Sequence, residues 1–130
     1  TMLRLAAERD EIGVVADQVG NPTSALEIAT GALRVAENLA KGTVEAQRGV
    51  FHMTGKGETS WAGFAEAIFA ESKAAGGPSA QVRHITTAQF PTPAARPANS
   101  RLDNTLLGHT HGVRLPAWQT SLAAVVHRLI

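Results

Sequence analysis

A proline-rich run between Phe90 and Asp103 constrains the fold of this chain more than any other stretch. It holds three of the six prolines and ends in a polar sequence. Each proline fixes its own φ and pushes the preceding residue toward extended geometry, so the run is predicted to be a stiff loop, neither a helix nor a central strand. Such a loop is a surface connector or a binding loop. In a binding loop, Arg96 and Arg101 would offer forked donors to phosphate.

The composition indicates one soluble globular domain over residues 1–130, with 44% hydrophobic and 18% charged residues. A net charge of +1 gives no field for steering nucleic acid and no polybasic membrane patch, so we expect neither partner. No apolar stretch approaches the roughly 20 residues that span a bilayer. Cysteine is absent, which excludes disulfides and is compatible with the cytoplasmic location that we expect. Because Thr1 precedes the first methionine, we expect a piece of a longer protein or a preceding remnant.

Helical and strand-like patterns alternate along the chain, which predicts an α/β fold without internal repeats. The predicted helices cover residues 1–9, 24–39 and about 60–75, a short piece that Asn104 caps, and a last helix that begins near Pro116. The predicted strands cover residues 12–16, 49–54 and 81–87. Turns are expected at residues 17–22, 55–58 and 108–112.

Apolar spacing predicts which side of each long helix is buried. Ser24 and Glu27 fit a capping box at the start of the first long helix. The predicted core residues of the three long helices are Ala25, Ile28, Ala29, Ala32, Val35, Ala36 and Leu39; Trp61, Phe64, Ala65, Ile68 and Phe69; and Trp118, Leu122, Val125, Val126 and Leu129. Both tryptophans are therefore assigned to the core.

Local motifs for chemistry are weak. Residues 55–60 resemble a glycine-rich dinucleotide turn with Ser60 in the third glycine position, but no acidic ribose partner follows the next strand, so a turn with a helix cap is the preferred interpretation. His109 and His111 lie in a predicted turn without a further ligand, and we expect no metal site. Asp17 and Glu58 are candidate acids without a predictable partner. No nucleophile elbow is present.

Five motifs, taken together, resemble those of one enzyme family. They are Pro91-Thr92-Pro93-Ala94 continued by Arg96-Pro97 and Asn99-Ser100-Arg101-Leu102; Asp17-Gln18-Val19-Gly20 with Pro22-Thr23; Gly49 to Gly55; Glu58-Thr59-Ser60-Trp61; and Arg114-Leu115-Pro116 with Trp118. Their sequences and order resemble the C-terminal part of dTDP-4-dehydrorhamnose reductases, which are NADPH-dependent members of the extended short-chain dehydrogenase/reductase family. The resemblance covers nearly the whole chain.

The resemblance implies the C-terminal substrate-binding portion of an extended short-chain dehydrogenase fold, with few short strands, three main helices and no Rossmann half. Enzymes of this family use a Tyr-x-x-x-Lys pair, whereas this chain has no tyrosine and lacks the glycine-rich cofactor turn. We therefore expect no catalytic residue, no NADPH bound by this chain alone and no turnover. The parent enzyme would use NADPH and a missing N-terminal Rossmann half to make dTDP-L-rhamnose, a polysaccharide precursor.

The resemblance also implies a site for a dTDP-sugar. It places Gln18, Gly20, Pro22 and Thr23 on a loop facing the substrate cleft, although a turn leading into a capped helix explains that loop equally well. It places Arg96, Asn99 and Ser100 on the later loop. Arg96 is expected to pair with the diphosphate, while Asn99 and Ser100 either contact the ligand or fix the loop.

Two further expectations concern partners. Without the Rossmann half, the strand at 50–53 and the helix from Ser24 lose their cover, so we expect the chain to self-associate; a monomer at every concentration in solution scattering would contradict this. A stand-alone, non-catalytic binding or assembly module is the alternative function, and it predicts tight folding alone without an upstream catalytic half. A fragment of a related epimerase or dehydratase is a third possibility, which the proline-rich sequence disfavours.

Overall fold

A computed structural model describes residues 1–42 and 47–130, and it shows an α/β fold with few short strands and three main helices. The helices are α1 (Met2–Ala6), α2 (Ala25–Ala40), α3 (Trp61–Ala74), the single 3₁₀ turn η2 (Thr87–Gln89), α4 (Thr105–His111) and α5 (Trp118–Leu129). The strands are β1 (Glu11–Val15), β2 (Val19–Gly20), β3 (Thr59–Ser60) and β4 (Gln81–Ile85). This architecture confirms the predicted fold class.

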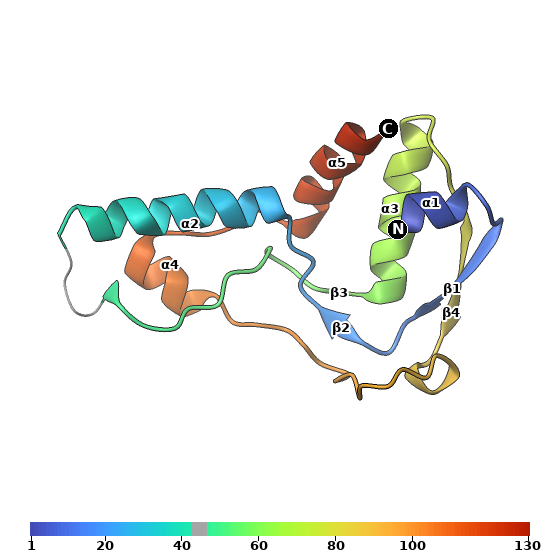
Figure 1. The fold of residues 1–130 in the computed structure, drawn as a ribbon, viewed down its shortest axis with the longest axis horizontal. Coiled ribbons are helices and arrows are strands. Elements are labelled where there is room, and N and C mark those ends of the chain that lie inside the picture. The colour runs from blue at the N-terminus through green and yellow to red at the C-terminus, as the bar shows by residue number, and fades with distance from the viewer. Residues whose placement is uncertain (43–46) are drawn as a thin grey trace.

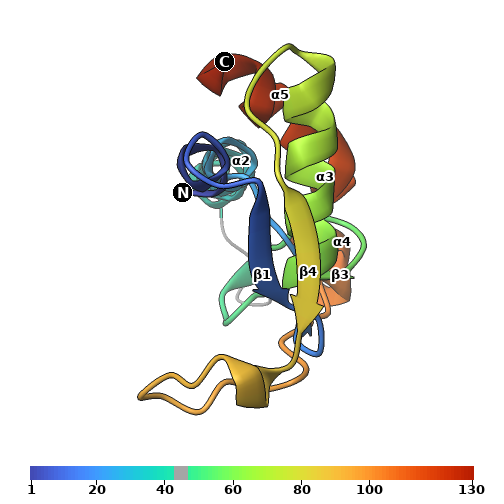
Figure 2. The same ribbon diagram turned by 90° about the vertical axis from the view of Figure 1, so that its right-hand side faces the viewer.

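The two longest strands, β1 and β4, form a parallel pair in which Ile12 faces Val82 and Val14 faces His84 (Figure 2). Side chains alternate between the two faces of a strand. Ile12 and Val14 are each 7% exposed, so the face of the pair that carries them is buried. Ile85, which is 8% exposed, pairs with Val15 and lies on the opposite face, beside Gly13. Within the described residues each of these strands pairs only with the other.

Helix α3 packs on this buried face and lies between the strand pair and α5 (Figures 1 and 2). Its side toward the strands carries small residues, with Ala62 and Ala65 almost completely buried and Phe69 3% exposed. Small side chains at the start of the helix let it approach the strands closely, while the Phe69 ring fills the space further along. Phe69 is therefore the largest side chain in this part of the core.

Helix α5 closes the other side of α3. Trp118, Leu122 and Val126 form the core of this contact, and Phe64 of α3 meets Trp118 edge to face with ring centroids 5.8 Å apart. The edge-to-face arrangement suits the charge distribution of two aromatic rings. Gly57, with φ of +89°, lies against Trp118 and turns the chain toward α3. The predicted core side of α5 is confirmed except for Leu129, which is 68% exposed.

Helix α2 extends away from this three-layered part, with α4 beside it (Figure 1). Ser24 caps α2 by accepting a hydrogen bond from the Leu26 amide at 3.3 Å. Gly31 is its one buried residue in the described chain. The predicted core face is wrong for this structure, because five of its seven members are exposed: Ala25, Ile28, Ala29, Ala32 and Ala36. The periodic pattern correctly gives the helix, but the described chain supplies little to cover that face. Self-association of this face stays a prediction.

Several local predictions are wrong. The segment 49–54 is not a strand, and Val50 is 86% exposed, because no described strand lies beside it to complete a ladder. His52, in the same segment, is also exposed. Residues 108–111 continue α4 instead of forming a turn, and the helix ends at Gly112 with φ of +66°. Asn104 does not cap α4 through its side chain, because that side chain bonds Thr54. Of the described helices, none is long and apolar enough to cross a membrane.

Candidate functional site

The proline-rich loop is attached to the rest of the molecule by a small sheet around Val19. Strand β2 pairs antiparallel with β3 on one side. On the other side, the Val19 amide donates to Ala98 O at 2.9 Å, and the Ser100 amide donates to Val19 O at 2.9 Å. The Ser100 hydroxyl donates to the same Val19 oxygen at 3.1 Å. Residues 98–100 therefore behave as an added edge strand, and residues 91–97 form an exposed excursion beyond it.

A cavity of about 400 Å³ lies where these segments meet the start of α3. Its lining residues come from four stretches of the chain: Gln18, Gly20, Asn21, Pro22 and Thr23; Thr54; Thr59, Ser60, Trp61 and Phe64; and Ser100 and Leu102. Aromatic side chains and hydrogen-bonding groups thus share one cavity, which is typical of small-molecule sites.

Asn21 connects three segments around this cavity. Its Nδ2 donates to Gly57 O at 2.7 Å, and its Oδ1 accepts from the Leu102 amide at 2.8 Å. A single side-chain amide therefore connects the loop after β2, the turn before β3 and the end of the proline-rich loop. From the sequence, Asn21 is only one residue of the turn expected at residues 17–22.

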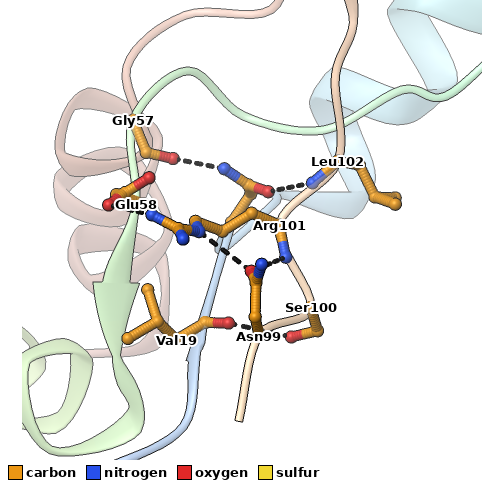
Figure 3. A network of polar contacts seen from close by, with 8 residues as sticks. Val19, Gly57, Glu58, Asn99, Ser100, Arg101 and Leu102 are labelled. Atoms are coloured by element: carbon orange, nitrogen blue, oxygen red, sulfur yellow. Dashed lines mark hydrogen bonds and ion pairs between the residues drawn. The ribbon is translucent and has the colours of Figure 1, made fainter. Parts of the chain in front are cut away.

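The side chain of Arg101 is engaged by two other residues of this chain. Its Nη1 lies 2.8 Å from Glu58 Oε1, and its Nε donates to Asn99 Oδ1 at 2.9 Å (Figure 3). Asn99 Oδ1 also accepts from the Arg101 amide at 3.1 Å. Arg101 and Asn99 therefore fix the loop, and Glu58 balances the charge that could otherwise face phosphate. Among the described residues, no ion-pair partner lies within 4.0 Å of Arg96, which is exposed.

The loop Gly20–Thr23 is shaped by close backbone approaches. A Cβ atom on Gly20 would lie 2.8 Å from Ser100 Oγ, and one on Gly55 would lie 2.5 Å from Pro22 O. The Thr23 hydroxyl donates to Asn21 O at 2.9 Å and accepts from the Gly55 amide at 3.0 Å. Gly20 and Gly55 are thus placed where a side chain would separate the walls of the cavity.

Gln18 and Asp17 connect the segment that borders the cavity to Thr87, just after β4. Gln18 is 9% exposed and its Nε2 donates to Thr87 Oγ1 at 3.0 Å. Asp17 accepts from the Thr87 amide at 2.9 and 3.0 Å and from the Thr87 hydroxyl at 2.7 Å. These hydrogen bonds, first that of the Thr87 amide and then that of its hydroxyl, lower the pKa of Asp17 below its ordinary value of 3.8. Asp17 is therefore an anchor for Thr87.

The lowered pKa of Asp17 predicts a pH-dependent stability. A carboxylate with a folded pKa below its unfolded one stabilises the protein above the ordinary value of 3.8, and this contribution is lost as the pH falls through the lower folded pKa. We expect Asp17→Asn to lower the melting temperature at about pH 7 and to have a much smaller effect at about pH 2. Thermal melts of the exposed control Asp10→Asn should show little difference at either pH; a constant deficit of Asp17→Asn across the range would contradict the assignment.

The structure brings together five of the seven residues implied by the resemblance. Gln18, Gly20, Pro22, Thr23 and Ser100 line the cavity. The other two do not line it: Asn99 turns to Arg101, and Arg96 lies on the exposed excursion. Sequence reasoning missed Asn21, Trp61, Leu102 and the pair of Glu58 with Arg101. None of these had a local signal: Trp61 lies at i, i+4 spacing from the buried Ala65, which predicts burial of Trp61 and not the exposure observed.

The turn at residues 55–60 does not fit a dinucleotide. The Gly55 amide donates to Thr23, and Ser60 Oγ accepts from the Gly63 amide at 3.1 Å, which caps α3. Gly55 and Gly57 pack against Pro22 and Trp118. The backbone amides that would bind a pyrophosphate therefore donate hydrogen bonds to side chains of this chain instead, and we assign no NADPH site to this turn. Among the described residues, no three histidine or acidic side chains gather as a metal site would require.

A two-stranded parallel pair, three long helices and a cavity bordered by loops define an α/β domain with a cavity of the kind found in small-molecule sites. The family model described as "RmlD substrate binding domain" matches residues 1–130. The chain therefore belongs to the RmlD substrate-binding domain family.

Several relatives of the chain are dTDP-4-dehydrorhamnose reductases. A dTDP-4-dehydrorhamnose reductase of Sinorhizobium fredii is 44% identical over 129 residues, which are 99% of this chain and 44% of the relative. The crystal structure of a dTDP-4-dehydrorhamnose reductase from Clostridium acetobutylicum superposes with a TM-score of 0.86 at 37% identity, covering 98% of this chain and 42% of that one. That of Bacillus anthracis, in complex with NADP, has a TM-score of 0.81 at 29% identity, covering 98% and 41%. The chain spans less than half the length of these relatives.

Proposed function

We propose that this chain is the nucleotide-sugar-binding part of an NADPH-dependent dTDP-4-dehydrorhamnose reductase acting in dTDP-L-rhamnose biosynthesis. The observation that carries the proposal is the convergence of Gln18, Gly20, Pro22, Thr23 and Ser100 on one cavity. These residues come from two distant motifs that resemble the reductases. The loop that brings Ser100 to the cavity is also the proline-rich loop with the most specific resemblance.

The residues of this chain indicate which steps it can carry out and which belong to the N-terminal half of the parent enzyme. It contains no tyrosine. Backbone amides of its glycine-rich turn and of the start of α3 already donate hydrogen bonds to side chains of the same chain. In the parent enzyme, we therefore assign NADPH and the proton donor for the substrate carbonyl to the N-terminal Rossmann half. The hydride would reach the carbonyl carbon at C4 and the proton its oxygen. The residues of this chain would bind and orient the dTDP-sugar, and the exposed face of α2 would pack on that half or on a second copy.

Arg96 is the residue we assign to the diphosphate. Arg101 is neutralised by Glu58, whereas no described carboxylate lies within ion-pair distance of Arg96. Arg96 is exposed on the excursion that leads into Ser100, which lines the cavity. A forked guanidinium that donates two hydrogen bonds to phosphate oxygens suits this task.

Calorimetric titration of the chain with dTDP tests the proposal. We expect saturable binding that Arg96→Gln weakens by about 10-fold or more, because hydrogen bonds to charged groups contribute about 1.5–3 kcal/mol. Arg34→Gln is the matched control, since Arg34 is exposed on α2 and pairs with Glu37; it should bind dTDP as the unsubstituted chain does. If Arg96→Gln bound dTDP as tightly as the unsubstituted chain, the diphosphate role of Arg96 would be excluded. The absence of dTDP binding would contradict the proposed function. Substrate-dependent NADPH consumption by the chain alone would contradict the assignment of NADPH and the proton donor to the N-terminal half.

A further inference from the structure

Trp61 is exposed where a core position was expected. Its relative exposure is 58%, although it is the first residue of α3 and begins the apolar stripe of that helix. The adjacent Ala62 takes the buried position against the strands. Trp61 instead lines the cavity of the candidate site, together with Phe64 one turn further along the helix. A large aromatic surface is therefore left facing a cavity instead of packing in the core.

The backbone beneath Trp61 is held firmly. Its amide donates to Gln18 O at 3.3 Å, and the preceding Ser60 pairs with Val19 and caps α3 through the Gly63 amide at 3.1 Å. Gln18 and Ser60 also line the cavity. The backbone that carries the indole is thus held by the same elements that position the polar lining, so little backbone freedom is lost at this position when a ligand binds.

The other residues that line the cavity indicate which kind of ligand could contact this aromatic surface. Leu102 adds apolar surface, while Thr54 and Ser100 add hydroxyl groups from two other segments. Apolar walls with a few converging polar groups suit a flat ring that has hydrogen-bonding atoms at its edge. Stacking on an aromatic side chain is the general way in which proteins hold the flat face of a nucleobase.

We propose that Trp61 is a ligand-binding residue on which the pyrimidine base of the nucleotide stacks, with Phe64 and Leu102 completing the apolar wall. The proposal deepens the proposed function and rests on it. It places the base at the start of α3, with the diphosphate reaching toward the loop that carries Arg96. It also explains why the chain exposes a tryptophan next to two buried alanine positions.

Titrations of the chain with dTDP and with inorganic pyrophosphate, which lacks the base, test this assignment. Trp61→Leu keeps an apolar side chain but removes the ring, and should weaken dTDP binding by about 5- to 150-fold, the effect of losing one stacked base. Trp61→Phe keeps a ring and should retain most of the affinity. Neither variant should alter the affinity for pyrophosphate. The matched control is Phe90→Leu, because Phe90 is 57% exposed and does not line the cavity.

Fluorescence gives a readout that a merely structural role would not produce. The chain has two tryptophans, and Trp118 is buried at 7% exposure. We expect dTDP to quench the emission of the unsubstituted chain and not that of Trp61→Phe, while the melting temperatures of the two proteins stay close. Unchanged dTDP affinity in a folded Trp61→Leu would overturn the stacking proposal and leave the proposed function intact. Failure of the unsubstituted chain to bind dTDP at all would overturn both.

Discussion

Phe69→Ala is expected to lower the free energy of unfolding by about 3–5 kcal/mol, the usual result of truncating a buried phenylalanine. Phe69 is 3% exposed and packs with Ile12 and Val14 of β1, where α3 covers the strand pair. Its removal leaves a cavity that the rigid strands cannot fill by moving inward. Because small domains are stable by only about 5–15 kcal/mol, the variant should melt far below the unsubstituted chain. Urea denaturation followed by circular dichroism measures the change.

Phe90→Ala is the matched control for this prediction. It removes the same atoms from a side chain that is 57% exposed on the loop after η2, and exposed substitutions usually change stability by no more than about 0.5 kcal/mol. Equal losses from the two variants would mean that α3 does not pack on the β1–β4 pair in solution, and the description of the core would be wrong.

Elements whose formation depends on nearby residues could be predicted from the sequence. The alternation of Ile12 and Val14 predicted β1. Ser24 was the predicted cap of α2, and α3 was predicted to begin near residue 60. In the structure, Ser24 and Ser60 accept hydrogen bonds from first-turn amides of these helices. A helix cap is made within three residues, so its sequence signal is complete.

Burial could not be predicted where it depends on another part of the protein. The segment around Val50 is as apolar as a buried strand, but a strand requires a neighbour for its ladder, and the described chain has none there. Helix α2 has a clear apolar face that is mostly exposed for the same reason. Periodicity shows which face of an element is apolar, but it does not show what covers that face.

The residues of the candidate site could be proposed only through resemblance, because the contacts among them join distant residues. Asn21 bonds Leu102 across 81 positions, and Arg101 pairs with Glu58 across 43. No pattern in a short window contains both partners of such a pair. The motifs supplied the residues of both loops, but only the structure separates those that line the cavity from those that fix the loop.

Gly55→Ala is expected to destabilise the chain by about 1–3 kcal/mol, the cost of overpacking a close contact, and to weaken dTDP binding. The new Cβ would lie 2.5 Å from Pro22 O. That oxygen belongs to the backbone, so it cannot rotate aside as a side chain can. The loop must move, and its movement would break the hydrogen bond from the Gly55 amide to Thr23 Oγ1 and displace one wall of the cavity. Denaturation midpoints and dTDP titration measure the two effects.

Gly31→Ala shows why the identity of the contacting atom matters. Its new Cβ would lie 2.8 Å from Met53 Sδ, against 2.5 Å from Pro22 O for Gly55. A methionine side chain, however, is flexible and adapts to a changed space. Alanine also favours the interior of a helix such as α2 by about 1 kcal/mol over glycine. We therefore expect a small net change in stability and unaltered dTDP binding. If Gly31→Ala proved as damaging as Gly55→Ala, the loss could not be attributed to the rigid Pro22 carbonyl, and the shape of the cavity wall would have to be explained in another way.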